Sequence, residues 1–367
     1  MTPLKVEKNT IEKKIKQRSC NLISLMGLDL KPILTYTNIK LDDLTNKIIA
    51  VDAFNTIHQF LSTIRGSTGE LLTNSQGEVT SHLSGLFYRN INLLAEGIKL
   101  VYVFDGVSSP LKVNEIQRRH QIKEVAAEKY EKALVEGKLE EARKYSQATS
   151  VLTDKMIDES KRLLSFLGIP TIQAPSEGEA TASNLTNSDL VHICASQDYD
   201  SILFGAKRLV RNVTISGKRK VPNRNAYIDV PLEMYYLEDI LKQTKLTIEQ
   251  MVDVGILIGT DYNFGGISGI GPKTALKLIQ KYSKLENIDQ LQEPLSNIPY
   301  EEIREIFLKP RVANVSTEDI KFESVGYDKI VQFLCSERNF SLDRVNSALQ
   351  KVQDSDKNKN QSLEKWF

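Results

Sequence analysis

The stretch APSEGEATASNLTNSDLVHICASQDYDSILFG, residues 174–205, decides the expected fold. Its apolar run at residues 190–195 is typical of a buried strand, and the polar segment before it is typical of a helix. Glu177 and Glu179 open this helix, whereas Asp198 and Asp200 leave the end of the strand. Four acids in one cleft repel one another unless cations lie between them, and oxygen ligands suit hard cations such as Mg²⁺ or Mn²⁺. The stretch therefore predicts most of a two-metal site.

A purely structural interpretation of the same acids is also open. Ser176, followed three residues later by Glu179, makes a capping-box pattern that needs no metal. Asp198 and Asp200 fit ordinary turn positions after a strand. Either pair alone favours this structural interpretation, so the decision depends on the rest of the chain.

The composition is that of a globular protein with reduced cysteines. Hydrophobic residues make up 41% of the 367 residues, a length that suggests one large or two ordinary domains. No apolar run approaches the roughly 20 residues that span a bilayer, so no membrane association is expected. Because Cys20, Cys194 and Cys335 lack metal-ligand spacing, we expect neither a zinc site nor a disulfide framework, and a cytoplasmic location.

Two further apolar runs end on an acid in the same way. Asp52 follows one run and Asp105 the other, with helical patterns at residues 55–64 and 80–96 between them. Apolar runs that alternate with helices predict an α/β fold with a mostly parallel central sheet flanked by helices. Functional groups collect at the carboxyl ends of parallel strands, so we expect Asp52, Asp105 and Asp198 in one place.

Two segments are rich in basic residues, although the net charge of the chain is only +1. Residues 111–148 carry nine Lys or Arg between Lys112 and Lys144, with an interruption at Gly137. This segment is either a surface helical hairpin or a helical arch through which a single strand passes. Residues 207–224 carry seven Lys or Arg and no acid, which indicates a face that meets a polyanion. The alternative is a solvated hairpin, which usually mixes both signs of charge.

A glycine-rich turn follows the last candidate acid. The helical pattern at residues 248–260 leads to Asp261, and the turn at residues 265–273 precedes another helix. Pro272 breaks the Gly-Lys-Thr run of a P-loop, and the turn lacks the strand and third glycine of a dinucleotide fingerprint. Its backbone N–H groups at a helix start fit a phosphate site that grips a duplex without reading bases. A tight connection between two helices is the alternative.

The ends of the chain carry no catalytic signal. Residues 1–25 are lysine-rich without the apolar region of a signal peptide, so we expect a disordered leader or an artefact of the chosen start site. Residues 285–352 predict helical support, and residues 353–359 predict a polar linker. The aromatic end of residues 360–367 fits a plug for the hydrophobic pocket of a partner, or else a tail that docks on its own domain.

Six motifs together resemble those of the archaeal-type flap endonucleases over residues 26–367. They are AVDAFNTIHQFL at 50–61, VYVFDG at 101–106, APSEGEA at 174–180, ASQDYDSILFG at 195–205, ILIGTDY at 256–262 and GISGIGPK at 266–273. The resemblance implies a nuclease region at residues 26–124, the remainder of a helical arch at 125–148, and a second nuclease region with a helix–two-turn–helix DNA-binding element at 149–284.

The resemblance also implies an activity. The enzyme would be a Mg²⁺-dependent monomer, with Mn²⁺ as a substitute, associated with the nucleoid of an archaeal-type cell. It would act on branched or nicked DNA with a 5′ flap, both as an endonuclease and as a 5′–3′ exonuclease. Its roles would be lagging-strand maturation and base excision repair.

Site residues are implied by the same motifs. One ion would be held by Asp52, Asp105, Glu177 and Glu179, and the second by Asp198, Asp200 and Asp261. Lys112 and Arg119 would be catalytic residues that steady the scissile phosphate. DNA would be held by Arg65, Arg89 and Arg211, and by a glycine turn with bound K⁺ at Gly269, Gly271 and Lys273. The replication sliding clamp would bind Asn360, Leu363, Trp366 and Phe367.

This sequence departs from the pattern of the family at three places. His58 stands where relatives carry a Tyr that stacks on a base, and an imidazole offers less stacking area. Asn360 replaces the Gln that usually opens the clamp peptide. Family members begin at the position of Met26, and a leader before Gly27 would crowd the active site.

Three other functions remain as alternatives. The first is another nuclease of the same superfamily, a repair exonuclease or junction resolvase, against which the short arch and the tail argue. The second is a catalytically silent DNA scaffold bound to the clamp, against which the full set of seven acids argues. The third is an RNA-cleaving domain of similar fold, which would lack the glycine turn. In the favoured function, paired ions activate water and stabilise charge on the phosphate, so no protein nucleophile is needed.

Overall fold

The computed structural model describes residues 28–214, 218–220 and 227–364, with only the backbone course of residues 218–220, 227–229 and 356–364. The expected leader at residues 1–25 lies outside the described residues, as do Trp366 and Phe367 of the tail. Of the other predicted clamp-binding residues, the backbones of Asn360 and Leu363 are described and their side chains are not.

A seven-stranded mixed sheet forms the centre of the protein. Its strands lie in the order β1-β9-β6-β5-β2-β3-β4. The five strands from β6 to β4 run parallel, whereas β9 is antiparallel to both β6 and β1. The strand bounds are β1 Thr37–Ile39, β2 Ile48–Asp52, β3 Lys99–Phe104, β4 Thr171–Gln173, β5 Ile193–Ala195, β6 Arg208–Arg211 and β9 Leu232–Tyr236. The predicted mostly parallel sheet flanked by helices is therefore confirmed, with an antiparallel edge that the sequence did not predict.

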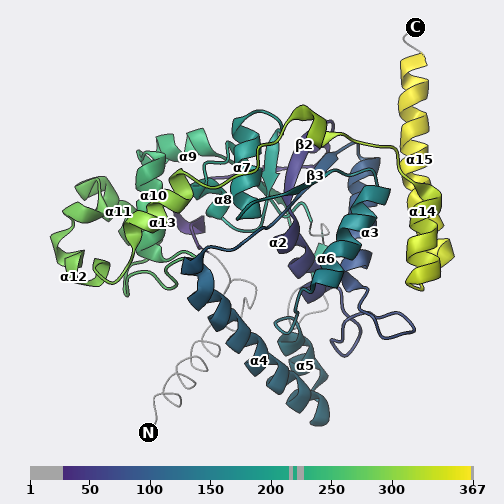
Figure 1. Cartoon of the computed structure of the whole chain (residues 1–367), viewed down its shortest axis with the longest axis horizontal. Helices are drawn as coiled ribbons and strands as arrows, with labels where there is room; N and C mark the ends of the chain where they lie inside the picture. The colour runs from purple at the N-terminus through teal and green to yellow at the C-terminus, as the bar shows by residue number, and fades with distance from the viewer. Residues whose placement is uncertain (1–27, 215–217, 221–226, 365–367) are drawn as a thin grey trace.

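The sheet is covered on both faces because the interior positions of its central strands β2, β3 and β5 are apolar. Along β2, Ile49 and Val51 pack into one core, while Ala50 between them packs into the other. The second face carries α7 Gly178–Asn187, α8 Asp200–Leu203, α10 Ile248–Ile258, α11 Pro272–Tyr282 and α13 Tyr300–Leu308. The first face carries α2 Ala53–Thr63, α3 Ser81–Ala95, α6 Asp154–Phe166, α14 Tyr327–Val331 and α15 Leu342–Glu364. The two layers of helices are seen on either side of β2 and β3 in Figure 1.

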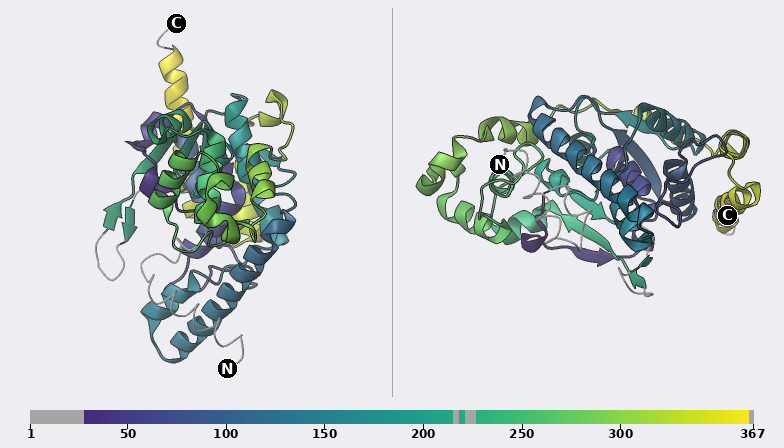
Figure 2. Two further views of the ribbon diagram at one scale, coloured as in Figure 1. Left: turned by 90° about the vertical axis from the view of Figure 1, so that its left-hand side faces the viewer. Right: turned by 90° about the horizontal axis from the view of Figure 1, so that it is seen from below.

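The basic segment after β3 forms a pair of helices that projects from the sheet. Helix α4 spans Val113–Val135 and α5 spans Leu139–Ser146, and the two lie against each other as an arch (Figures 1 and 2). Gly137 has a φ of +69°, the left-handed conformation that ends α4 and lets the chain reverse. Few large apolar residues of α4 are buried, so the arch is held mainly at its base.

The glycine turn joins α10 to α11 as a compact helix–turn–turn–helix. Gly259 ends α10 with a φ of +108°, and a Cβ at this position would lie 2.4 Å from the backbone nitrogen of Gly266. The backbone N–H of Ile267 donates to the carbonyl of Leu257 over 2.9 Å, which fixes the turn on the end of the helix. Helix α11 then begins at Pro272, with Gly271 as its N-cap. This close backbone packing requires the glycines at 259 and 266.

The C-terminal part departs from the prediction at residues 353–359. These residues, predicted as a linker, continue α15, which runs without interruption to Glu364. The helix is anchored here by Val352, which is buried directly before these residues, and by the hydroxyl of Ser355 within them, which donates to the carbonyl of Ala95. The predicted helical support at residues 285–352 also contains irregular chain between α13 and α14. Within the described residues, no helix combines the length and the apolar character needed to cross a membrane.

Candidate active site

The acids that end β2 and β3 lie at the same edge of the sheet. Asp52 is the N-cap of α2, and its carboxylate accepts from the backbone N–H of Asn55 over 3.0 Å. Asp105 follows β3 directly and accepts from the backbone N–H of Gly178 over 2.7 Å. A Cβ at Gly178 would come within 2.5 Å of the Asp105 carboxylate, so only glycine admits this contact. The start of α7 is thereby bound to the end of β3.

Helix α7 brings two more acids to this edge. Its N-cap is Glu177, and no side chain caps the helix, so the capping box predicted for Ser176 and Glu179 is absent. Glu179 instead accepts hydrogen bonds from two hydroxyls, that of Ser196 directly after β5 and that of Ser201 on α8. Glu179 is therefore held among the other acids, and the capping box that the structural interpretation required is not formed.

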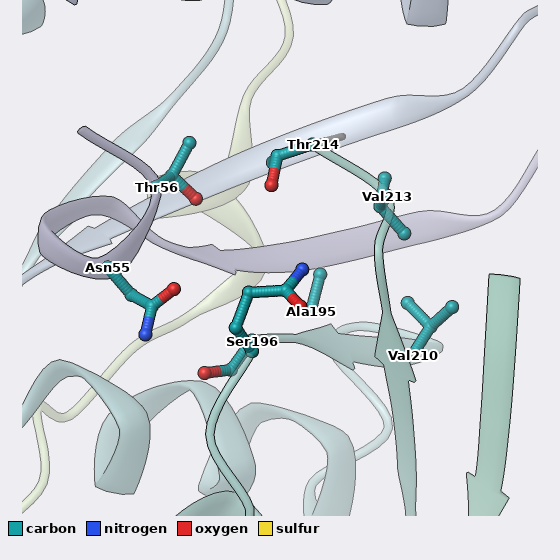
Figure 3. Close-up of a pocket in the computed structure, with 8 residues that line it drawn as sticks. Asn55, Thr56, Ala195, Ser196, Val210, Val213 and Thr214 are labelled. Carbon is teal, nitrogen blue, oxygen red and sulfur yellow. The ribbon is translucent and has the colours of Figure 1, made fainter. Parts of the chain in front are cut away.

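The acids after β5 are fixed by their neighbours in the same way. The amide of Asn55 donates to Asp198 Oδ2 over 2.7 Å, and the hydroxyl of Ser196 accepts from the backbone N–H of Asp198 over 3.1 Å. Asn55 and Ser196 both line a narrow crevice between the start of α2 and the end of β5 (Figure 3). Asp200 stands at the first position of α8 and is buried. Neither Asn55 nor Ser196 was predicted, although both stand within three residues of a predicted acid.

Mutual repulsion shows that the seven acids form one cluster. Burial and then the charge of Glu177 raise the pKa of Asp105 to about 6. Burial and then the charge of Asp261 raise the pKa of Asp198 to about 6 as well. Three more acids have a pKa well above the usual value, because of burial first and neighbouring carboxylates second: Asp52, Glu179 and Asp200. So many raised values in one cleft are typical of a functional site.

Two basic side chains from the base of the arch reach into the cluster. Lys112 Nζ lies 2.6 Å from Glu177 Oε2 and 3.3 Å from Asp261 Oδ2. Arg119 Nη2 lies 2.6 Å from Asp261 Oδ1. Burial alone would raise the pKa of Asp261, but these two cations hold it below its usual value. The predicted catalytic pair therefore lies among the predicted metal ligands.

Glu115 organises this end of the arch, although no sequence motif singled it out. Its carboxylate is buried and accepts from Arg118 Nε over 2.6 Å, from Arg118 Nη2 over 2.7 Å and from Arg119 Nε over 2.8 Å. The spacing of three and four residues on a helix could have predicted these pairs. Glu115 thus sets the direction of both guanidinium groups.

The cleft meets the chemical requirements of a divalent cation site. Glu177 Oε1 and Asp200 Oδ1 are buried oxygens without a hydrogen-bond partner among the described residues. In that part of the chain, no three acidic, histidine or cysteine side chains are already arranged around one point as metal ligands. The arrangement nevertheless fits cations, because buried carboxylate oxygens that lack donors and repel one another are stabilised by hard divalent ions. Glu177 and Asp200 supply these oxygens, and the carboxylates of the other five predicted acids lie in the same cluster.

The predicted DNA-binding arginines are engaged with their own chain. Arg65 donates to the carbonyls of Leu61 and Gly69 and to the hydroxyl of Ser150. Arg89 donates to the carbonyl of Val213 over 2.6 Å. These bonds tie the ends of α2 and β6 to neighbouring elements, so in this structure both arginines support the backbone around the site.

Arg211 lies beneath the acids rather than on an open face. It donates to the carbonyl of Gln197 over 3.1 Å and to Glu233 Oε2 over 3.1 Å. Its guanidinium also covers the ring of Tyr199 at 4.2 Å. Lys207 and Arg208 of the same basic strip likewise bond to backbone carbonyls.

His58 and the glycine turn belong to different elements of the fold. His58 is on α2, where burial and then the charges of Lys123 and Arg119 lower its pKa to about 4. Lys273 is exposed on the first turn of α11. Gly269 has a φ of +85°, and a Cβ at this position would meet no atom within 4 Å. The predicted phosphate site at this turn is therefore open.

A sheet that gathers acids at one edge, beneath a basic helical arch, defines a nuclease of the XPG class. Residues 24–126 match the XPG N-terminal domain, and residues 168–261 match the XPG I-region. Flap endonuclease 1 of Nitrosopumilus maritimus is 54% identical over 342 residues, which cover 93% of this chain and all of that protein. The chain belongs to the flap endonuclease family.

Solved structures agree with this assignment. The flap endonuclease-1 from Methanococcus jannaschii is 35% identical with a TM-score of 0.69, covering 91% of this chain and 100% of that one. The catalytic core of Rad2 in complex with DNA substrate is 25% identical with a TM-score of 0.65, covering 86% of this chain and 96% of that one. The protein is a structure-specific 5′ flap endonuclease, a DNA hydrolase of replication and repair, from a family of metal-dependent nucleases.

Proposed function

We propose that the protein cleaves its DNA substrate by two-metal hydrolysis with Mg²⁺, which Mn²⁺ can replace. The observation that carries this proposal is the pair of buried oxygens Glu177 Oε1 and Asp200 Oδ1 within the acidic cluster, for which the described part of the chain offers no hydrogen-bond partner. One ion would be held by Asp52, Asp105, Glu177 and Glu179, and the other by Asp198, Asp200 and Asp261. Such ions supply an activated water and stabilise charge on the attacking and leaving oxygens.

The side chains of the protein would orient and stabilise the phosphate. Lys112 and Arg119 lie beside the acids and remain charged. Burial lowers the pKa of each side chain, but the neighbouring carboxylates outweigh this effect and keep the pKa of both above the usual value. In the complex, their N–H groups would turn toward the scissile phosphate and stabilise its developing negative charge. Asn55, Ser196 and Glu115 would hold the acids and Arg119 in place, since their hydrogen bonds already do so.

Contacts outside the cleft would hold the duplex and the strand. The turn at Gly269, Gly271 and Lys273 would bind duplex phosphates, together with a K⁺ ion, because it presents the N-terminus of α11 without side-chain cover. His58, neutral at physiological pH, would stack on a base near the scissile bond. Arg65, Arg89 and Arg211 would act chiefly through the backbone segments that they hold.

We also propose a biological setting for this activity. We place the enzyme, as a monomer, at the nucleoid in the cytoplasm of an archaeal-type cell. There it would process 5′ flaps as an endonuclease and nicked or gapped duplexes as a 5′–3′ exonuclease, in lagging-strand maturation and base excision repair. The tail at Asn360, Leu363, Trp366 and Phe367 would bind the replication sliding clamp.

Product mapping on labelled DNA tests the proposal. A double-flap substrate, a nicked duplex and a four-way junction are each digested with Mg²⁺, Mn²⁺ or excess chelator. We expect one cut near the base of the 5′ flap, slower release of nucleotides from the nick, and no cleavage in chelator. Symmetric cuts in the junction at a higher rate would instead identify a junction resolvase. Equal cleavage in chelator would overturn the two-metal mechanism.

A further inference from the structure

A second cleft lies next to Asp261. It has a volume of about 410 Å³ and lies between the start of α4, the loop after α10 and the segment before α13. Its apolar lining includes Val113, Phe264 and Ile298. Because Asp261 both lines this cleft and belongs to the acidic cluster, the cleft adjoins the site where the acids lie.

Phe264 is the feature of this cleft that packing does not explain. It is 53% exposed, even though the guanidinium of Arg118 stacks on its ring at 3.7 Å. An exposed aromatic ring with an arginine on one face offers further stacking area to a planar ligand. A residue that served only the core would have been covered by its neighbours.

The ring and the arginine are held in place before any ligand arrives. Arg118 is fixed by two hydrogen bonds to the buried carboxylate of Glu115, at 2.6 and 2.7 Å. The loop that carries Phe264 is fixed by Asn263, whose amide bonds to Thr260 and to the carbonyl of Ile256. A preorganised aromatic surface loses little conformational entropy when a ligand binds.

We propose that this cleft binds a nucleobase of the single-stranded 5′ flap, stacked on the Phe264–Arg118 pair. Every base has an apolar π-face that suits an aromatic ring and a guanidinium plane, so the site would tolerate any sequence. Phosphates on either side of the base would lie near Arg118 and Arg119. The site would draw the flap away from the duplex on the far side of the acids.

Fluorescence of 2-aminopurine tests the site apart from catalysis. The probe is placed at each of the first flap nucleotides in turn, and at matching positions in the template strand, with Ca²⁺ in place of Mg²⁺ to allow binding. We expect strong quenching at one flap position with the wild-type protein. Phe264→Ala should abolish this quenching and weaken the affinity for the flap substrate by about tenfold relative to a nicked duplex, whereas Phe264→Tyr should keep both.

Matched variants separate stacking from bulk and charge. Phe264→Leu keeps apolar volume and Arg118→Lys keeps charge, and both should lose most of the quenching. Val135→Ala, at an exposed site on the arch, should change nothing. Quenching that persists in Phe264→Ala, or that arises only in the template strand, would overturn the proposal. Loss of binding to nicked duplex in the wild-type protein would contradict the DNA-binding function itself and not the cleft alone.

Discussion

The ammonium group of Lys112 donates a hydrogen bond of 2.6 Å to Glu177 Oε2, across the space between the arch and helix α7. The same group lies 3.3 Å from Asp261, and it faces the ring of Tyr262 at 5.2 Å. One cation thus compensates two acids that would otherwise repel each other. When cations and a phosphate bind in the cleft, the ammonium group of Lys112 is placed to donate to a phosphate oxygen instead of to a carboxylate.

We expect Lys112→Ala to reduce single-turnover cleavage by a factor of about 10² to 10³, because it removes a charged donor from the transition state. The affinity for DNA should change by no more than about threefold, since one charge of many is lost. Lys132→Ala, which removes an exposed charge from the same helix, should leave the rate unchanged. Cleavage at the wild-type rate in Lys112→Ala would show that the lysine only neutralises the acids.

Asp200→Asn should separate binding from cleavage. Its carboxylate is buried, and one oxygen has no partner among the described residues, so the amide removes repulsion in the absence of divalent ions. We expect the free energy of unfolding in chelator to rise by about 1 kcal/mol, while cleavage is lost and DNA affinity stays nearly intact. Chemical denaturation and anisotropy measure these effects, with Asp354→Asn on the exposed face of α15 as the control. Strong residual turnover with Mg²⁺ would remove Asp200 from the mechanism.

The location of the acids was predictable because it depends on local pattern and sheet geometry. Apolar runs that end at Asp52, Asp105 and Asp198 become parallel strands, and parallel strands place their carboxyl ends together. The antiparallel edge was not predictable in the same way. Strand β1, at Thr37–Ile39, has three residues and little burial, and its pairing with β9 joins positions about two hundred residues apart.

The partners of the site residues were the least predictable part. Arg211 lies in a basic strip, and the strip suggested a phosphate contact. Its bond to Glu233 arises from antiparallel pairing between β6 and β9, which no local pattern encodes. The hydroxyl of Ser196, directly after β5, donates to Glu179 on α7, and this contact depends likewise on how separate elements pack. Contacts between distant segments need the tertiary fold before they can be assigned.

His58 provides a test by pH. Its pKa is about 4 in the folded protein, because burial and then Lys123 and Arg119 disfavour the charged imidazole, against an ordinary value of 6.5. Between these values the unfolded chain binds more protons, so the contribution of His58 to stability is complete above about pH 6.5 and is lost as the pH falls toward 4. His58→Phe should therefore lose less stability than the wild type between pH 7 and 4.5, by on the order of 2 kcal/mol.

Urea denaturation at several pH values measures this difference. His120→Phe, which replaces an exposed histidine of α4, is the matched control and should follow the wild type. Parallel curves for the wild type and His58→Phe would show that the imidazole titrates as it does in the unfolded chain.

Arg211→Gln tests whether this arginine acts on the DNA or on the site. The guanidinium donates to the carbonyl of Gln197, directly before Asp198, so its loss should loosen that acid. We expect cleavage to fall by about tenfold, with a higher Mg²⁺ requirement, while the salt dependence of DNA binding stays unchanged. Arg208→Gln removes the same charge from the same strand and should leave both properties near wild type. A shallower salt dependence in Arg211→Gln alone would identify a phosphate contact instead.

Removal of residues 360–367 should affect the clamp and not the nuclease. Among the residues of α15 whose side chains are described, Val352 is the last one buried, and the Ser355 hydroxyl donates to the carbonyl of Ala95, so the truncation leaves both contacts in place. Cleavage of naked DNA should stay within about twofold of the full chain, because the removed residues lie beyond these contacts.

Stimulation by the sliding clamp should be lost, both in the truncated chain and in Trp366→Ala/Phe367→Ala. Val352→Asp, which buries a charge against α3, should instead lower stability by about 3 kcal/mol. Equal stimulation of the full and truncated chains would place the clamp contact elsewhere on the surface.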